Sequence, residues 1–493
     1  MIIAATIPTP KVDWLALSPT LALLAVSGIT LLGAVLVPSA GRRVFSVAVS
    51  LAGLATAGVL AGFLFDRSAD ASLVLAESLT RDRLAALAQI VLVVIGAAVV
   101  LLSAGDRRTD HVGEYYALLA AATAGMVFFV SAGNLMTLFL AFEWFSIALY
   151  VLCALDTHRR ASLEAGLKYL IVGSFGSGFL LFGCELVYGA TGELGFNAIR
   201  DATGADDPLF ITGLALILAG LAFKVSAAPF HMWTPDVYQG APTPVTAFMA
   251  AATKVAALVV TFRLLVTAFP EQDEVWTIAI AALAVASLLI GNLGALVQRD
   301  VKRLLAYSSI SNAGFLLIAI AADTELGGQA LLYFLVPYSA ATVGAFAVVA
   351  ARERELRRPV DLTALEGFGW ERPFLGVALW IFMLSFAGFP LTGGFLGKFY
   401  VFAAIFEAGW WWLVVLGVIA TAISIAYYLS LVRALYMRSG EVSAPVIAVG
   451  GSPPRDPALT AAVAVAVAVT IGSFFAVQPL VDLARDAVAV LPL

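Results

Sequence analysis

Apolar runs of about twenty residues alternate along this chain with short polar segments. A helix needs a run of about that length to cross the hydrocarbon core of a lipid bilayer. The pattern therefore predicts an all-α polytopic membrane protein with about 14 transmembrane helices. We expect spans near residues 14–37, 44–65, 84–104, 113–131, 134–155, 167–188, 208–230, 243–268, 276–297, 302–321, 328–350, 373–408, 411–436 and 458–480.

The composition agrees with this prediction and excludes several kinds of chemistry. Of 493 residues, 61% are hydrophobic and 12% charged, whereas about 25% of residues are charged in an average soluble protein. The sequence has no Walker loop, no GxGxxG motif after a strand and no cysteine run for an iron–sulfur cluster. We expect no cofactor, bound metal or nucleic acid in this chain. Any coupled redox chemistry or ATP hydrolysis must then take place in other chains.

Basic residues are divided unevenly between the two sides of the predicted bundle. If the N-terminus lies outside, the cytoplasmic loops hold most arginines, including Arg42, Arg43, Arg357 and Arg358. The outer loops carry acidic clusters at 206–207 and 271–274. Because cytoplasmic loops of membrane proteins are enriched in Lys and Arg, an even number of spans predicts both termini on the outer, periplasmic side.

Two expected spans are interrupted, 208–230 by Pro229 and 373–408 by Pro390, Gly393 and Gly394. A broken helix exposes backbone groups that must line a protein-buried or hydrated cavity. Since the interrupted spans are five crossings apart, five-helix repeats that contain them must be inverted, as in transporters with an ion site at the midplane. Glycine and proline are also common in membrane helices, which is the alternative explanation.

This symmetry predicts four parts of the chain. They are an N-terminal three-helix segment (1–110), a first inverted repeat (111–268), a second inverted repeat (269–440) and a C-terminal span (441–493). Each repeat contains one of the broken helices.

Four ionisable side chains fall inside the expected spans, namely Glu143, Lys224, Lys254 and Lys398. A lysine at mid-span costs roughly 2.5–3.5 kcal/mol on insertion scales, so the four groups together cost about 10 kcal/mol. An amine that gains and loses a proton inside the membrane accounts for such a cost. We therefore predict that all four take part in proton transfer.

Glu143 and Lys224 are predicted to act together. If they face each other, each stabilises the charged form of the other, whereas desolvation favours both neutral forms once they separate. Movement of Glu143 would then release the proton of Lys224. The alternative is a static ion pair that joins two helices. Lys254 would be the next proton acceptor, and Lys398, beside the second break, the terminal one.

Polar side chains between the lysines are candidates for a relay. Such groups hold water between proton carriers, although hydroxyls in membrane helices often bond only to their own backbone. The sequence leaves both interpretations open. The candidates are Tyr307, Ser308, Ser309 and Asn312 in the tenth span and Ser424 and Tyr427 in the thirteenth.

Several stretches resemble a known family. LAFKVSAAPFHMWTPDVYQGAPTPVTAF, VKRLLAYSSIS and FAGFPLTGGFLGKF resemble the antiporter-like subunits of respiratory complex I, which are related to the large subunits of multi-subunit sodium/proton antiporters. FEWFSIALYVLCAL and RRASLEAGLKYLIVGSFGSGFLLFG look most like subunit N of bacterial NADH-quinone oxidoreductase. Lys398, in place of a glutamate, argues against subunit M, and the lack of a long C-terminal lateral helix argues against subunit L.

The resemblance implies a proton channel in two inverted five-helix repeats, driven by quinone reduction elsewhere in a complex. It matches Glu143 and Lys224 to the family's glutamate–lysine pair, Lys254 to its central lysine and Lys398 to its exit lysine. It places quinone, NADH, FMN and iron–sulfur clusters in partner subunits. The implied partners are a neighbouring antiporter-like subunit and small quinone-proximal membrane subunits, in the bacterial inner membrane.

One residue departs from the family pattern, and other functions fit the same residues. Asn312 stands where the family commonly has a histidine, so we expect water held by Asn312 and Tyr307 to replace a titrating group. The alternative functions are the large subunit of a cation/proton antiporter or of a membrane-bound hydrogenase. A stand-alone solute transporter is a third possibility, of a different class.

Overall fold

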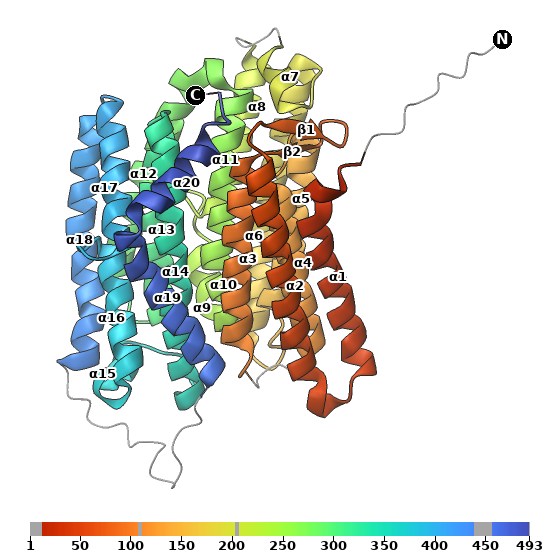
Figure 1. Ribbon diagram of the computed structural model, residues 1–493. Helices are drawn as coiled ribbons and strands as arrows, with labels where there is room; N and C mark the ends of the chain where they lie inside the picture. The colour runs from red at the N-terminus through yellow and green to blue at the C-terminus, as the bar shows by residue number, and fades with distance from the viewer. Residues whose placement is uncertain (1–11, 107–110, 203–206, 438–455, 493) are drawn as a thin grey trace.

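The computed structural model describes residues 12–106, 111–202, 207–437 and 456–492, which form an elongated bundle of helices (Figure 1). The helices are α1 (Trp14–Leu36), α2 (Ser39–Arg67), α3 (Arg83–Ser103), α4 (Val112–Phe129), α5 (Leu135–Cys153), α6 (Arg160–Thr191), α7 (Phe196–Arg200), α8 (Pro208–Val225), α9 (Thr234–Gly240), α10 (Thr243–Phe248), α11 (Lys254–Ala268), α12 (Asp273–Leu296), α13 (Val301–Ala321), α14 (Glu325–Leu356), α15 (Phe368–Glu371), α16 (Pro373–Ala387), α17 (Gly393–Glu407), α18 (Trp411–Tyr436), α19 (Pro457–Phe475) and α20 (Val477–Val488). Strands β1 (Ser72–Val74) and β2 (Leu79–Arg81) form a small antiparallel hairpin in which Ser72 lies opposite Arg81.

The predicted membrane architecture is confirmed. Among the described residues, thirteen helical segments are long and apolar enough to cross a membrane, and one of them joins α10 and α11. The shorter helices α16 and α17 follow each other as the two halves of a further, broken crossing. Together these segments agree with the apolar pattern, which predicts about 14 crossings.

Burial increases from the outside of the bundle to its centre. The crossing formed by α10 and α11 is buried along its whole length, and α13 and α14 are almost as well covered. By contrast, α6 exposes Phe175, Phe179 and Phe182. Exposed aromatic rings along a spanning helix suit contact with lipid or another membrane helix, whereas polar groups concentrate inside.

Small residues let neighbouring helices approach closely. A Cβ atom on Gly183 of α6 would lie 2.7 Å from the carbonyl oxygen of Gly213 on α8. The same close approach recurs about two turns along, between Gly220 and the backbone of α6 at Gly176. This is the small-residue packing by which membrane helices associate, and it fixes α8 against α6.

Both predicted breaks are present, and they lie in crossings of opposite direction. The helix α8 ends at Val225, where Ser226 adopts a left-handed conformation, and the chain resumes as α9. The helix α16 ends at Ala387, followed by left-handed Gly388. Figure 1 shows α8 beginning near α7 at one end of the bundle and α16 beginning near α15 at the other. The boundaries of the repeats stay a prediction.

The C-terminal region differs from the sequence prediction. The expected last span, 458–480, ends earlier, at Phe475, and a separate amphipathic helix, α20, follows. Pro479 explains the early end, because its ring lacks an N–H and would clash with the carbonyl of Phe475 in a continuous helix. The helix α20 buries Val481 and Ala484 and lies against α14 and α3.

Charged residues gather at the two ends of the bundle. At one end Arg43 contacts the backbone of Asp106, and Arg354 pairs with Asp456. We call this end, with Arg43, Arg159, Arg354, Arg357, Arg358 and Arg372, the arginine-rich face. At the opposite end Arg263 of α11 forms a buried two-pronged ion pair with Asp82, which caps the N-terminus of α3.

Candidate functional site

The three lysines of the apolar spans lie inside the protein. Lys224 and Lys254 are 0% exposed and Lys398 is 3% exposed. Long lysine side chains near a helix end often extend to the membrane surface, and none of these three does so. All three amines are therefore held away from lipid headgroups, in the interior of the bundle.

Lys224 lies in the last turn of α8, next to the first break, in a pocket of aromatic rings and hydroxyls. Its ammonium donates to Ser146 Oγ at 2.7 Å and to the Tyr169 hydroxyl at 3.2 Å. The rings of Phe142 and Phe145 lie 4.9 and 4.8 Å from it. Cation–π contacts of this kind stabilise a desolvated ammonium, so the pocket suits a charged lysine without a carboxylate partner.

Glu143 lies one turn of α5 before Ser146, the hydroxyl that Lys224 contacts. No ion pair joins Glu143 to Lys224 or to another basic residue that the structure describes. Its Oε1 atom is buried without a hydrogen-bond partner in the described chain. The predicted pairing of Glu143 with Lys224 stays a prediction; in this conformation Lys224 contacts the Ser146 hydroxyl, one turn away from Glu143 on α5.

The break after Lys224 is held by side chains from three elements. Trp233 donates its indole N–H to the carbonyl of Phe223 at 3.2 Å and stacks on Tyr169, with ring centroids 4.5 Å apart. The backbone N–H of Ala228 donates to Ser287 of α12 at 2.8 Å. These contacts satisfy backbone groups that a continuous helix would have paired, and they hold the break at the end of α8 against α6 and α12.

Lys254 follows a local change of helix type. Residues Met249–Thr253 form a π-helix between α10 and α11, and Lys254 is the first residue of α11. Its ammonium has no hydrogen-bond partner among the described residues. Single-turn π-helices often mark functional positions, since they shift side chains out of the regular register. The sequence predicts a buried Lys254, but no signal in it predicted the π-helix.

Several relay candidates of α13 and α18 meet in one cluster. Ser308 Oγ and the Tyr428 hydroxyl are 2.6 Å apart, and Asn312 Nδ2 donates to the same hydroxyl at 3.3 Å. Tyr427 donates to Asn292 Oδ1 of α12 at 3.0 Å. Hydroxyl groups can act as donor or acceptor, whereas the amide N–H only donates and the amide oxygen only accepts. This cluster connects three helices through such polar atoms.

The structure does not bring every relay candidate into the cluster. Ser309 bonds instead to the Tyr338 hydroxyl of α14, at 2.9 Å. Tyr307 packs on Gly294 of α12 and is partly exposed. Ser424 donates to the carbonyl of Thr421 in its own helix, which is the local capping role.

Lys398 lies in α17, across the second break from α16. Its ammonium donates to the carbonyl of Phe386 at 2.8 Å and lies 4.3 Å from the centre of the Phe315 ring. A Cβ on Gly394 would collide with the carbonyl oxygen of Ser385. The glycine therefore permits the close approach of α17 to the end of α16 that brings Lys398 to the freed carbonyl.

Sequence reasoning missed the immediate partners of the lysines. Ser146, Tyr169 and the Phe386 carbonyl are the groups that receive the lysine N–H donors. A serine three residues after Glu143, on the same helix face, was an available signal. The contacts from Tyr169 and Phe386 depend on tertiary packing and have no signature in the sequence.

The site residues can hold and exchange protons but offer no metal site. Within the described residues, no group of three or more His, Cys, Asp or Glu side chains could bind a metal ion. Cys153 and Cys184 are buried free thiols. The chemistry that the arrangement can carry is movement of protons between buried amines, hydroxyls and water.

A family model and several named relatives match this chain, and they point to the same family. The family described as NADH:quinone oxidoreductase/Mrp antiporter transmembrane proteins matches residues 132–424, more than half of the chain. NADH-quinone oxidoreductase subunit N of Salinibacter ruber is 43% identical over 398 residues, which cover 79% of each chain. Subunit N of Mycobacterium tuberculosis is 41% identical over 400 residues, 79% of this chain and 74% of the relative.

Solved structures share the whole architecture. A chain of respiratory complex I from Thermus thermophilus is 33% identical, with a TM-score of 0.76, over 94% of this chain and 99% of that chain. A chain of the Mrp complex from Dietzia sp. DQ12-45-1b is 22% identical, with a TM-score of 0.84, over 96% and 97%. The second match shows a common fold alone.

Proposed function

Because this chain belongs to the family of NADH-quinone oxidoreductase subunit N, we propose that its buried lysines carry protons across the membrane within respiratory complex I. The chain is a multi-pass membrane subunit of that translocase. The electron transfer that drives it takes place in other subunits, where quinone, NADH, FMN and the iron–sulfur clusters belong. The chain itself supplies the route for protons.

The observation that carries the proposal is the burial of Lys224, Lys254 and Lys398, none of which forms an ion pair with a carboxylate in the part of the chain that the structure describes. Buried lysines kept only for stability are expected to be ion-paired, since an unpaired buried charge is costly. A lysine that alternates between ammonium and amine avoids that cost for part of each cycle. Three such groups on three different helices fit a stepwise transfer.

We assign the steps as the sequence predicts them. Glu143 controls whether Lys224 holds its proton. Lys224 then passes that proton to Lys254 in the central helix. The cluster of Ser308, Asn312 and Tyr428 lies in the second half of the bundle, towards Lys398, the last lysine. The direct Asn312–Tyr428 contact supports a role for Asn312 as a hydrogen-bonding group.

The surroundings of the chain follow from the same family. We propose the bacterial inner membrane as its location, with the arginine-rich face towards the cytoplasm, in line with the positive-inside rule. Both termini then lie on the periplasmic side. The proposed partners are a neighbouring antiporter-like subunit and small quinone-proximal membrane subunits.

Replacement of Lys398 in the assembled complex tests this function. In proteoliposomes, Lys398→Met should lower the number of protons moved per NADH while the complex still assembles. Lys168→Met is the matched control, because Lys168 is 43% exposed and pairs with Glu164 and Asp236 at the surface. Equal pumping by both variants would refute a role for Lys398.

The alternative functions have weaker support. The Mrp complex chain and a chain of the archaeal sulfane sulfur reductase, 24% identical, share the fold alone. The relatives at about 40% identity bear the subunit N name. Proton or solute transport by the isolated chain in liposomes would favour a stand-alone transporter instead.

A further inference from the structure

A second set of buried charges lies at the arginine-rich face, apart from the three lysines discussed above. Lys302, in the first turn of α13, and Glu353, in the last turn of α14, are both 2% exposed. Lys302 Nζ lies 3.8 Å from Glu353 Oε1. The Thr243 hydroxyl, at the start of α10, donates to Glu353 Oε2 at 2.6 Å and accepts from Lys302 Nζ at 3.3 Å. Thr243 therefore bridges the two charged groups.

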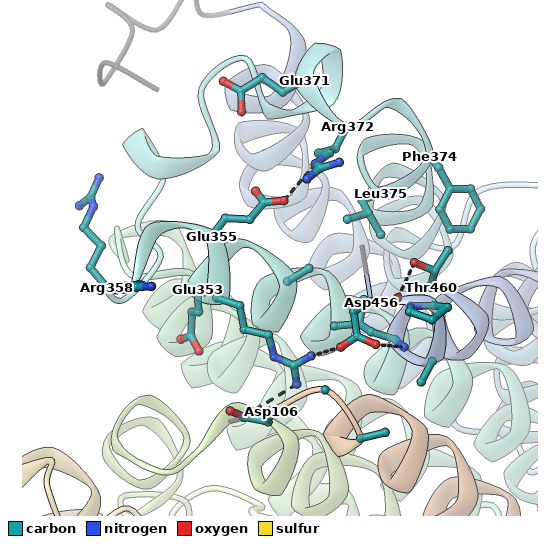
Figure 2. Close-up of a pocket in the computed structure, with 18 of the residues that line it drawn as sticks. Asp106, Glu353, Glu355, Arg358, Glu371, Arg372, Phe374, Leu375, Asp456 and Thr460 are labelled. Carbon is teal, nitrogen blue, oxygen red and sulfur yellow. Dashed lines mark hydrogen bonds and ion pairs between the residues drawn. The ribbon is translucent and has the colours of Figure 1, made fainter. Parts of the chain in front are cut away.

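Glu353 also borders a large cavity on its other side. This outer cavity has a volume of about 1200 Å³ and is lined by Glu353 together with Arg354, Arg358 and Asp456 (Figure 2). Many water molecules fit such a volume, since each occupies about 30 Å³ in the liquid. The charged lining suits water, and Glu353 thus borders this outer cavity while its carboxyl contacts Thr243 and Lys302 inside the protein.

A small inner cavity lies deeper along the same helix pair. It measures about 10 Å³, about the space of one water molecule. Leu305, one turn of α13 beyond Lys302 and so about 4.5 Å further along the axis, lines it together with Ser308, Ser309 and Tyr338. With Thr342, four hydroxyl-bearing residues thus line a space that is large enough for a single water.

The inner cavity shares one lining residue, Phe386, with the surroundings of Lys398. The carbonyl of Phe386 accepts the Lys398 ammonium at 2.8 Å. The order of groups from the arginine-rich face is therefore the outer cavity, Glu353, Thr243, Lys302, the inner cavity and Lys398. An apolar step past Leu305 separates Lys302 from the inner cavity.

We infer that Thr243, Lys302 and Glu353 form a proton inlet that takes protons from the arginine-rich face and passes them between α13 and α14 towards Lys398. This inference rests on the proposed function and extends it. It assigns the second half of the subunit its own source of protons, independent of the Glu143–Lys224 site.

One transfer through the inlet balances as follows. The Lys302 ammonium gives a proton to a water molecule that passes Leu305 from the inner cavity, and becomes a neutral amine. Glu353 takes a proton from hydronium in the outer cavity, which leaves water. The Thr243 hydroxyl then accepts the proton of the Glu353 carboxyl as it gives its own proton to Lys302. The starting ion pair is restored, and one proton has moved inward.

The opposing interpretation is a static ion pair that joins three helix ends. The protein builds a clamp of that kind at its other end, where Arg263 contacts Asp82 through two nitrogens. Arginine stays charged in proteins, whereas a buried lysine loses its proton readily. The inlet instead has a lysine, a looser 3.8 Å separation and a bridging hydroxyl. These features favour transfer over clamping.

The test uses the assembled complex in proteoliposomes, with NADH oxidation and proton translocation measured separately. Lys302→Arg keeps the charge pair but removes the group that releases a proton. We expect it to assemble and to move fewer protons per NADH, with transfer through this route slowed about a hundredfold or more. Pumping by Lys302→Arg at the unchanged level would overturn the inlet.

A double variant, Lys302→Met with Glu353→Gln, separates relay from clamp. Lys302→Met alone would leave the Glu353 charge buried and unpaired, whereas the double variant leaves no unpaired charge. If the pair is only a clamp, the double variant should regain both the assembly and the pumping that Lys302→Met loses. The inlet predicts recovery of assembly without recovery of pumping. Glu355→Gln is the control, because Glu355 lines the same cavity but pairs with Arg372 and Arg352 at the surface; it should pump normally.

Lys224→Ala, measured in parallel, distinguishes the two levels of failure. If the Lys302 variants pump normally while Lys224→Ala does not, the inlet is wrong and the proposed function stands. If Lys224→Ala also pumps normally, the proposed function itself fails. Reduced pumping in the Lys302 variants and in Lys224→Ala supports the inlet as well as the proposed function.

Discussion

Lys224 donates its hydrogen bond to Ser146, one turn of α5 beyond Glu143, and not to the Glu143 carboxylate. Ser146 and Glu143 lie on the same face of α5, and among the described residues no ion pair joins Glu143 to Lys224 of α8. We propose that a shift of α5 against α8 exchanges the serine hydroxyl for the carboxylate. Such an exchange would change which protonation state of Lys224 is favoured, and this is the property that a proton pump requires.

Ser146→Ala tests whether this hydroxyl matters to the lysine. A hydrogen bond to a charged group contributes about 1.5–3 kcal/mol, so its loss should alter proton transfer at Lys224 about tenfold or more. Protons moved per NADH, measured in the assembled complex, should fall. Ser174→Ala is the control, because Ser174 bonds only to the carbonyl of Leu170 in its own helix. Equal pumping in the two variants would mean that Ser146 is not needed.

Gly388→Ala should disturb Lys398 through the backbone of the second break. Gly388 has a φ of 79°, and an added Cβ would lie 3.0 Å from Lys398 Cδ. Left-handed conformations cost residues with a Cβ about 1–2 kcal/mol. Gly409, with a φ of 86° and open space around it, gives a control with the same backbone cost. Pumping should fall in Gly388→Ala and not in Gly409→Ala, whereas a purely conformational effect would make the two variants alike.

The buried pair of Arg263 and Asp82 should stabilise the fold rather than carry protons. Arg263→Met alone leaves a buried carboxylate unpaired and should destabilise the protein by about 3–5 kcal/mol. Adding Asp82→Asn removes that charge, keeps the cap of α3 and should restore much of the stability. Thermal unfolding of the purified complex measures both. If Asp82→Asn does not raise the unfolding temperature of the Arg263→Met variant, the ion-pair explanation is wrong.

Asn312 should act as a hydrogen-bonding group rather than as a proton carrier. Asn312→Leu removes its contact with the Tyr428 hydroxyl and should lower pumping in the assembled complex. Asn312→His keeps a polar side chain and should preserve pumping. If Asn312→Leu pumps like the unchanged protein, the cluster around Tyr428 does not belong to the path.

Labelling of single cysteines tests the orientation. With the buried thiols of Cys153 and Cys184 replaced by serine, an impermeant maleimide should reach Ser72→Cys in the β1–β2 hairpin from the periplasmic side. It should reach Thr363→Cys, beside the arginine-rich face, only in inside-out vesicles. Both residues are exposed. The reverse pattern would invert the proposed topology.

Much of the fold follows from the sequence because lipid leaves few choices. Apolar length fixes the crossings, and Pro229 and Gly393 mark the breaks that the structure contains. The end of the last span was misplaced because hydropathy continues past Phe475, while Pro479 stops the helix. Amphipathic α20 and the β1–β2 hairpin carry too weak an apolar signal to predict.

The sequence points to the candidate residues of the site but not to their contacts. A lysine in an apolar run is visible at once, as with Lys254. Lys302 was not, because it lies next to a loop and its burial depends on Glu353, about fifty residues away in the sequence. Packing of α10, α13 and α14 decides that burial, and no local pattern encodes it.

The most direct test of the central claim is Lys224→Ala in the assembled complex, with electron transfer and proton translocation measured in the same proteoliposomes. We predict an intact complex that moves fewer protons for each NADH oxidised, because the amine beside Ser146 and Glu143 is gone. Full assembly with an unchanged ratio of protons to electrons would contradict proton transfer through the buried lysines.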